Sequence, residues 1–185
     1  LLKKNSNKKI IDTKINEREN KAKKVAKKLG VKKIFFLRYP DLKLYKSNKQ
    51  EITSKLISII NITKPDTVFI HSNKDLHPDH RVSNECSITA LRPILKKNPT
   101  EIFAFEIPSS SVWSFGQFGE FRPNLFFDIE KEIDEKNKLL SIYNTELWKP
   151  PHPLSKKYLK QNANVAGAYN NINFSERFEC IKILR

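Results

Sequence analysis

Apolar residues recur at two different spacings along the chain. In four segments they follow the i, i+3, i+4, i+7 spacing of a helix with one buried face, as Ala22, Val25, Ala26 and Leu29 do. Between these segments lie short apolar runs that are typical of buried strands. The predicted helices cover residues 17–29, 50–61, 82–95 and 130–143, and the predicted strands cover residues 31–38, 67–70, 101–107, 124–129 and 178–184.

The order of these elements predicts the fold class. A strand, a helix and a second strand follow one another between residues 31 and 70, which is the spacing of a βαβ unit with parallel strands and a right-handed crossover. We find no internal repeat and no long low-complexity linker. The pattern therefore predicts one α/β domain over residues 1–185, with a mostly parallel sheet and helices on both faces.

Composition narrows the class of protein. The 185 residues carry a formal net charge of +15, which by itself favours nucleic acid as a partner. The excess is mostly lysine, spread along the chain, and no aromatic residues alternate with it as a base-stacking surface requires. We therefore interpret the charge as solvated surface and expect no nucleic-acid partner. No apolar run approaches the roughly 18 residues of a transmembrane helix.

The two cysteines and the absent methionines add two expectations. Cys86 falls on the apolar face of a predicted helix and Cys180 in a predicted strand, and neither has the spacing of a thiolate metal site. A pair of reduced thiols favours a cytoplasmic protein. The chain contains no methionine, so we expect it to begin inside a longer gene product or to have lost its start by processing.

The segment from Asp75 to Ser83 carries the candidate chemistry. It follows the predicted strand 67–70 and precedes a predicted helix, and ligands of open α/β sheets bind beyond the carboxyl ends of the strands. Two histidines, His77 and His80, lie here beside two carboxylates, Asp75 and Asp79. An imidazole can bind a metal, and a carboxylate can bind it too or orient the imidazole. A polar loop with exposed histidines explains the pattern about equally well. Two histidines alone do not complete a catalytic zinc site, which usually has three protein ligands.

The ordered motifs resemble those of the PIG-L/LmbE family of zinc-dependent N-acetylglucosaminyl deacetylases. The likeness spans roughly residues 17–184. Its most specific part is the run from Phe69 to Arg81, and it also includes the segments at residues 23–37, 39–41, 106–110, 123–129 and 175–179. The resemblance implies a Rossmann-like α/β fold and Zn²⁺ as the cofactor.

The resemblance also implies roles for single residues. His80 would be a zinc ligand, His77 would stabilise the tetrahedral oxyanion or protonate the leaving amine, and Asp79 would orient a histidine. Arg18 would lie near the substrate. From the residues themselves, Trp113 and Ser109, in a loop rich in small and aromatic residues, are candidates for binding a sugar, although core packing and a turn explain them equally simply.

One departure from the family pattern concerns the rest of the active site. The family begins with a strand that ends in a His-Pro-Asp-Asp motif, which supplies two further metal ligands and the general base. None of the four histidines is followed by Pro-Asp-Asp. We therefore expect this chain to hold about half of the site and to show little deacetylase activity alone.

The sequence thus predicts a metal-dependent deacetylase that acts on a small-molecule or glycoconjugate amino sugar. Two alternatives stay open. The first is an inactive sugar-binding or partner-binding relic of the same fold, and the second is a basic nucleic-acid-binding domain.

Overall fold

The chain forms two compact units. Unit 1 comprises Leu1–Arg38 and Lys131–Lys160, and unit 2 comprises Tyr39–Glu130 and Gln161–Arg185. The computed structural model describes residues 2–94 and 98–185, with side chains from residue 11 onward in these ranges. Of the predicted helix 82–95, Leu95 lies outside the described residues.

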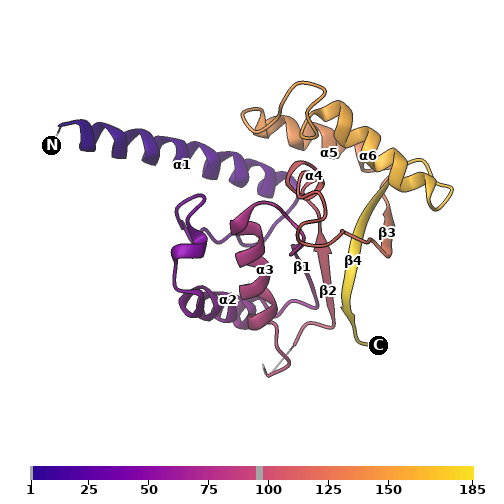
Figure 1. Ribbon diagram of the computed structural model, residues 1–185, viewed down its shortest axis with the longest axis horizontal. Coiled ribbons are helices and arrows are strands. Elements are labelled where there is room, and N and C mark those ends of the chain that lie inside the picture. Colours follow the sequence, from indigo (N-terminus) through magenta and orange to yellow (C-terminus); the bar gives the residue numbers. More distant parts are fainter. Residues whose placement is uncertain (1, 95–97) are drawn as a thin grey trace. The chain divides into compact units, whose positions relative to one another are not determined.

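Unit 2 contains a four-stranded sheet and the helices that lead to its strands (Figure 1). Its elements are η1 (Leu44–Lys46), α2 (Lys49–Thr63), β1 (Thr67–His71), α3 (Pro78–Ala90), β2 (Glu101–Phe105), α4 (Pro108–Val112), β3 (Leu125–Asp128) and β4 (Ser175–Ile183). The elements of unit 1 are α1 (Leu2–Lys28), α5 (Ile133–Leu140) and η2 (Ser141–Tyr143). Helix α6 (Lys156–Ala168) begins in unit 1 and ends in unit 2.

The sheet of unit 2 corrects the predicted strand pairing. Its order is β1-β2-β4-β3, with β1 and β2 parallel and with β4 antiparallel to both of its neighbours. Strands β1, β2 and β3 therefore run in one direction, and β4 lies between two of them in the opposite direction. The prediction of a mostly parallel sheet is wrong, because the apolar pattern of a strand carries no information about its direction.

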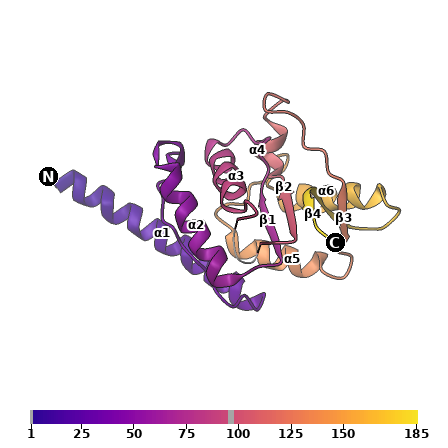
Figure 2. The ribbon, with the colours of Figure 1, turned by 90° about the horizontal axis from the view of Figure 1, so that it is seen from below.

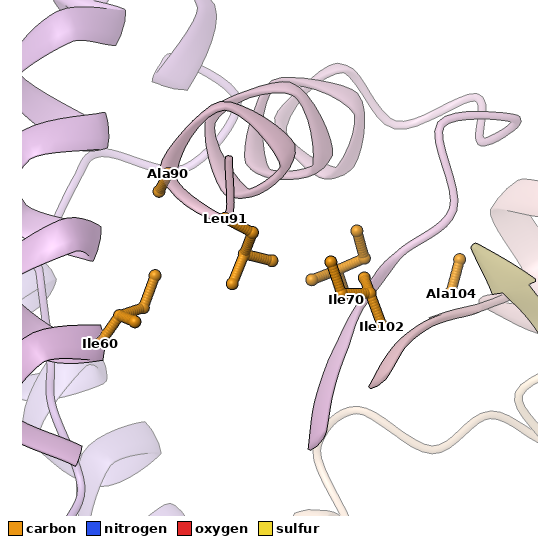
Figure 3. Packing of buried hydrophobic residues seen from close by; sticks show 6 residues of the cluster. All are labelled: Ile60, Ile70, Ala90, Leu91, Ile102 and Ala104. Carbon is orange, nitrogen blue, oxygen red and sulfur yellow. The ribbon is translucent and has the colours of Figure 1, made fainter. Parts of the chain in front are cut away.

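Helices α2 and α3 cover one face of β1 and β2 (Figures 1 and 2). The core between them consists of Ile60, Ile70, Ala90, Leu91, Ile102 and Ala104, whose side chains meet between the two helices and the two strands (Figure 3). Burial of such side chains is the main favourable term in folding. This packing fixes α3, and hence the loop before it, against the end of β1.

The second face of the same sheet carries four phenylalanines. The Phe69 ring lies 5.4 Å from that of Phe103 and 5.0 Å from that of Phe178, and Phe178 lies 5.6 Å from Phe127. Phe103 is buried, whereas Phe69 and Phe127 stay exposed. Within unit 2, the prediction of helices on both faces is therefore confirmed for the face that α2 and α3 cover.

In unit 1, the predicted strand over residues 31–38 is not formed. Residues 33–38 have no regular structure, and Ile34, Phe35 and Phe36 are exposed. A strand needs a neighbour to satisfy its backbone groups, and an apolar run does not supply one. The helix before it ends as predicted near Gly30, whose φ of +68° is readily adopted by glycine. Helix α1 begins far earlier than residue 17, at Leu2.

None of the helices in the described part of the chain combines the length and the apolar character needed to cross a membrane. Both cysteines are free thiols, and Cys86 is buried in the core of unit 2.

Candidate active site

The loop between β1 and α3 is built around one buried carboxylate. Asp75 is 1% exposed. Its Oδ1 accepts a hydrogen bond from the His77 backbone N–H at 2.7 Å, and its Oδ2 accepts hydroxyl hydrogen bonds from Ser110 at 2.8 Å and Ser111 at 3.3 Å. A buried carboxylate is tolerated only when its oxygens are satisfied in this way.

The same carboxylate faces the imidazole of His80. Asp75 Oδ2 lies 3.1 Å from His80 Nδ1, which is the distance of an ion pair, although this nitrogen makes no aligned hydrogen bond among the described residues. We infer that Nδ1 carries the proton, because it faces a carboxylate. The lone pair is then on Nε2, the nitrogen that a metal or a proton can bind.

Electrostatics favour the charged form of Asp75. Burial by itself raises the pKa of this carboxyl, but the His80 imidazole, the His77 N–H and the Ser110 hydroxyl outweigh burial and lower the pKa below its ordinary value. Asp75 is therefore an anion at neutral pH and can hold the imidazole in one tautomer.

His77 begins helix α3 as its N-cap. Its Nδ1 accepts a hydrogen bond from the Asp79 backbone N–H at 3.2 Å, and Pro78 occupies the first turn as predicted. The proton of a neutral His77 is thus on Nε2. A nitrogen of this kind can donate a hydrogen bond to an oxygen that gains negative charge during a reaction.

Three imidazole rings form one stack. The His80 ring lies 4.2 Å from the His71 ring at an interplanar angle of 3°, and 4.3 Å from the His77 ring at 20°. The sequence motifs predict no role for His71. His71 is the last residue of β1, at the edge of the sheet where the motif lies. This position in the sequence is the feature that could have predicted its place beside His80. Burial lowers the pKa of His71 to about 4, with a smaller contribution from His80.

Asp79, to which the family resemblance assigns an orienting role, contacts the segment before α2. Its Oδ1 accepts a hydrogen bond from the Leu44 N–H at 3.0 Å, which attaches the loop before α2 to the first turn of α3. The carboxylate in contact with His80 is that of Asp75. An orienting role for the Asp79 carboxylate toward a histidine therefore stays a prediction, whereas the Asp79 backbone N–H does contact a histidine, at His77 Nδ1.

The predicted substrate residues lie in different surroundings. Ser109 is buried in α4, and its neighbours Ser110 and Ser111 make the contacts with Asp75. Trp113 caps the end of α4 and is exposed. Arg18 belongs to unit 1, where it pairs with Glu146 at 2.9 Å.

Phe118, from the loop rich in small and aromatic residues, contacts Arg81 of the motif loop. The guanidinium of Arg81 lies 3.8 Å from the centre of the Phe118 ring. Its Nη1 donates hydrogen bonds to the backbone oxygens of Asp75 and Leu76 at 2.6 and 2.7 Å. Arg81 therefore fixes the backbone of the motif loop, and one face of Phe118 is covered.

The histidines do not by themselves fit a complete zinc site. No group of three His, Cys, Asp or Glu residues in the described ranges is arranged to hold a metal ion. Stacked, nearly parallel rings keep their lone pairs in separate, nearly parallel planes, whereas the lone pairs of metal ligands must converge on one point. His80, whose side chain is 23% exposed, can supply one ligand. A groove of about 380 Å³ between α2 and α3 is lined by other residues, among them Lys49, Glu85 and Arg92.

Comparison with known proteins identifies a family that resembles the first part of the chain. Residues 3–91, slightly under half of the chain, match the family model described as PIG-L, GlcNAc-PI de-N-acetylase. The resemblance predicted from the sequence is thereby confirmed over these residues.

Two solved structures share the fold. The conserved protein TT1542 from Thermus thermophilus is 20% identical with a TM-score of 0.74, over 92% of this chain and 76% of that one. The N,N'-diacetylchitobiose deacetylase from Pyrococcus horikoshii is 22% identical with a TM-score of 0.66, over 90% of this chain and 64% of that one. The present chain thus spans less than two thirds of the length of the deacetylase. At these identities the likeness shows the fold alone.

Proposed function

Because residues 3–91 match the PIG-L family model, we propose that the protein removes the N-acetyl group of an amino sugar by amide hydrolysis. The single observation that carries this proposal is the loop in which Asp75 faces His80 Nδ1 at 3.1 Å while His77 stacks on the same ring. It lies in the segment that the family model matches. The name of the structurally similar chitobiose deacetylase supports the same class of substrate.

The chain's own residues account for two parts of such a reaction. Asp75 keeps the proton of His80 on Nδ1, so Nε2 is available as a donor of its lone pair. His77, whose Nδ1 is occupied by the Asp79 N–H, presents its Nε2–H as a hydrogen-bond donor. Attack of water on an acetyl carbonyl places negative charge on the carbonyl oxygen, and a fixed donor near that oxygen stabilises it.

We propose Zn²⁺ as the cofactor, with His80 Nε2 as one ligand. When bound, zinc supplies an acidified water and polarises a carbonyl. The described residues contain no set of three ligands, so this chain alone should bind zinc weakly and show low activity.

Substrate contacts, partners and location follow the sequence predictions and are part of the proposal. Trp113 is the best placed of the predicted sugar-binding residues, since it is exposed and follows the helix that holds Ser110. We propose a small-molecule or glycoconjugate amino sugar as the substrate and the cytoplasm as the location.

The proposal is tested by acetate release from N-acetylglucosamine derivatives and N,N'-diacetylchitobiose, with and without added Zn²⁺. We expect low, zinc-dependent turnover that His80→Ala abolishes. His152→Ala is the matched control, because His152 belongs to unit 1. Turnover that is equal in wild type and His80→Ala would contradict the assignment.

The incomplete ligand set in the described ranges favours one second candidate, a sugar-binding protein without activity. Calorimetry with the same sugars distinguishes the two. Binding that Trp113→Ala weakens, without acetate release at any zinc concentration, would support the second candidate against the first.

A further inference from the structure

The net positive charge of the protein lies almost entirely in one unit. Unit 1 contains 21 Lys and Arg residues and 7 Asp and Glu residues, for a net charge of +14. Unit 2, which is much the larger, contains 14 and 13, for a net charge of +1. Because unit 1 is made of two separate stretches of the chain, this division is hidden in the sequence, where lysines occur from one end to the other.

The available positive charge of unit 1 belongs to lysines. Lys14, Lys24, Lys27 and Lys28 are exposed on α1, and none forms an ion pair with a carboxylate in the described part of the chain. At 100° per residue, Lys24, Lys27 and Lys28 occupy the side of α1 away from its apolar stripe, and Lys14 lies at the border of the stripe.

The arginines of unit 1 are engaged within it. Arg18 pairs with Glu146 at 2.9 Å. Arg38 makes a bidentate ion pair with Glu19, in which Nε and Nη2 donate hydrogen bonds to the two carboxylate oxygens at 2.7 and 2.9 Å. The residue type best suited to bidentate phosphate and base recognition is therefore already occupied.

Apolar side chains are exposed in the same unit. Ile11 is 56% exposed and Ile15 also lies on the surface, one turn apart on the apolar stripe of α1, and Leu29 continues the stripe at its end. Trp148 is 62% exposed and stacks on His152 at 4.8 Å. Exposed aliphatic and indole side chains combined with a lysine-rich polar face are typical of surfaces that bind the headgroup region of a bilayer.

We propose that unit 1 binds an anionic phospholipid bilayer. Its lysine ammonium groups meet the lipid phosphates, and Ile11, Ile15 and Trp148 enter the interfacial layer. A single lysine near an anionic surface strengthens binding by about fivefold, so a unit with a net charge of +14 supplies enough attraction for peripheral binding. Nucleic acid is a less suitable partner. In the described part of the unit, both arginine guanidinium groups are already ion-paired, and no row of aromatic residues is available for base stacking. The proposal does not depend on the deacetylase activity.

The test is flotation of the full chain with vesicles of phosphatidylcholine alone and of phosphatidylcholine with about 30% phosphatidylglycerol. We expect binding to the anionic vesicles at about 50 mM NaCl, at least a roughly tenfold loss at about 500 mM, and no binding to the neutral vesicles. Lys14→Glu with Lys24→Glu and Lys28→Glu should weaken binding by about tenfold or more. The matched control reverses three exposed charges of unit 2, Lys43→Glu, Lys46→Glu and Arg122→Glu, and should weaken it by less than about threefold.

Tryptophan emission tests insertion into the bilayer separately from electrostatic attraction, because net charge alone does not shift the emission wavelength. In a Trp113→Phe variant, vesicles should shift the emission of Trp148 to shorter wavelength, and in a Trp148→Phe variant the emission of Trp113 should stay unchanged. Equal losses in the two triple variants would overturn the proposal. Tighter binding to a short single-stranded RNA or DNA than to vesicles of the same phosphate concentration would overturn it as well, in favour of a nucleic-acid partner.

Discussion

The two units differ in how much net charge they carry. Unit 2 is nearly neutral, and its key carboxylate, Asp75, is 1% exposed and held by backbone, hydroxyl and imidazole groups. Unit 1 carries most of the net charge. It also has one buried carboxylate, Glu19, which is 7% exposed and pairs with Arg38, but the ion pair of Arg18 with Glu146 keeps 60% and 46% of its side chains exposed. The buried charge of unit 2 orients a histidine, whereas the excess charge of unit 1 lies on exposed lysines, where a partner can reach it.

Removal of the buried carboxylate should have the largest effect on stability. Asp75→Ala leaves the Ser110 hydroxyl, the His77 N–H and the His80 imidazole without their partner, and we expect the free energy of unfolding of unit 2 to fall by about 3–5 kcal/mol. Urea denaturation in a Trp148→Phe background, where Trp113 reports on unit 2, measures it.

The matched control is Asp134→Ala in unit 1. This carboxylate is 79% exposed beside Lys160, so its loss should change stability by less than about 0.5 kcal/mol. Equal effects of the two substitutions would remove the contrast between the units.

Close backbone packing in unit 2 gives the next largest effect. A Cβ at Gly167 would lie 2.5 Å from the Ile172 backbone oxygen and 2.9 Å from two further backbone atoms. Gly167→Ala should therefore cost about 3 kcal/mol, read by Trp113 emission in urea.

Gly30 of unit 1 is the counterpart. Nothing lies within 4 Å of its Cβ position, and its φ of +68° alone opposes a side chain. Gly30→Ala should cost about 1 kcal/mol, read by Trp148 in a Trp113→Phe background. A larger loss at Gly30 than at Gly167 would show that the end of α6 is packed more loosely than its backbone contacts indicate.

Acid should destabilise unit 2 through His71. The pKa of His71 is about 4 in the folded protein because of burial, against an ordinary value of 6.5. As the pH falls from 6.5 towards 4, the unfolded chain binds a proton that the folded one does not, so stability is lost in this window. By linkage, the loss between about pH 8 and about pH 5 is about 2 kcal/mol.

The comparison of His71→Phe with wild type at about pH 8 and about pH 5 isolates this effect. The phenylalanine variant keeps an aromatic ring in the stack and should lose about 2 kcal/mol less than wild type on acidification. His152→Gln, in unit 1, should leave the pH dependence of unit 2 unchanged. If His71→Phe shows the same loss as wild type, another group is responsible.

The smallest effect concerns Arg18. Because its ion pair with Glu146 is exposed, Arg18→Ala should lower the stability of unit 1 by less than about 1 kcal/mol, as read by Trp148 emission. If Arg18 also binds substrate, as the family resemblance implies, the KM for acetate release should rise at unchanged stability. An unchanged KM would leave Arg18 as a surface ion pair only.

The sequence predicts elements better than it predicts their pairing. Helical spacing predicts α2 within two residues of its bounds, and the apolar run that begins at Thr67 predicts β1. Both succeed because the burial of a single element follows from the spacing of its own apolar residues. The direction of β4 and the absence of a strand at Ile34 depend on which strands lie beside these segments, and a local pattern does not predict that.

The candidate site was predictable in position and only partly in detail. The motif identifies His77 and His80 and offers Asp75 and Asp79 as partners. The choice between the two carboxylates depends on how the chain turns after β1, which brings Ser110 and Ser111 to Asp75 and turns Asp79 towards the backbone of Leu44.

The assignment of the site depends most on the arrangement in which Asp75 leaves Nε2 of His80 able to bind a ligand. A zinc titration followed by calorimetry and by imidazole nitrogen NMR resonances tests it directly. We predict weak binding of one Zn²⁺, a shift of the His80 Nε2 resonance, loss of binding in His80→Ala and no change in His152→Ala. Binding of zinc by His80→Ala with the affinity of the wild type would contradict the assignment.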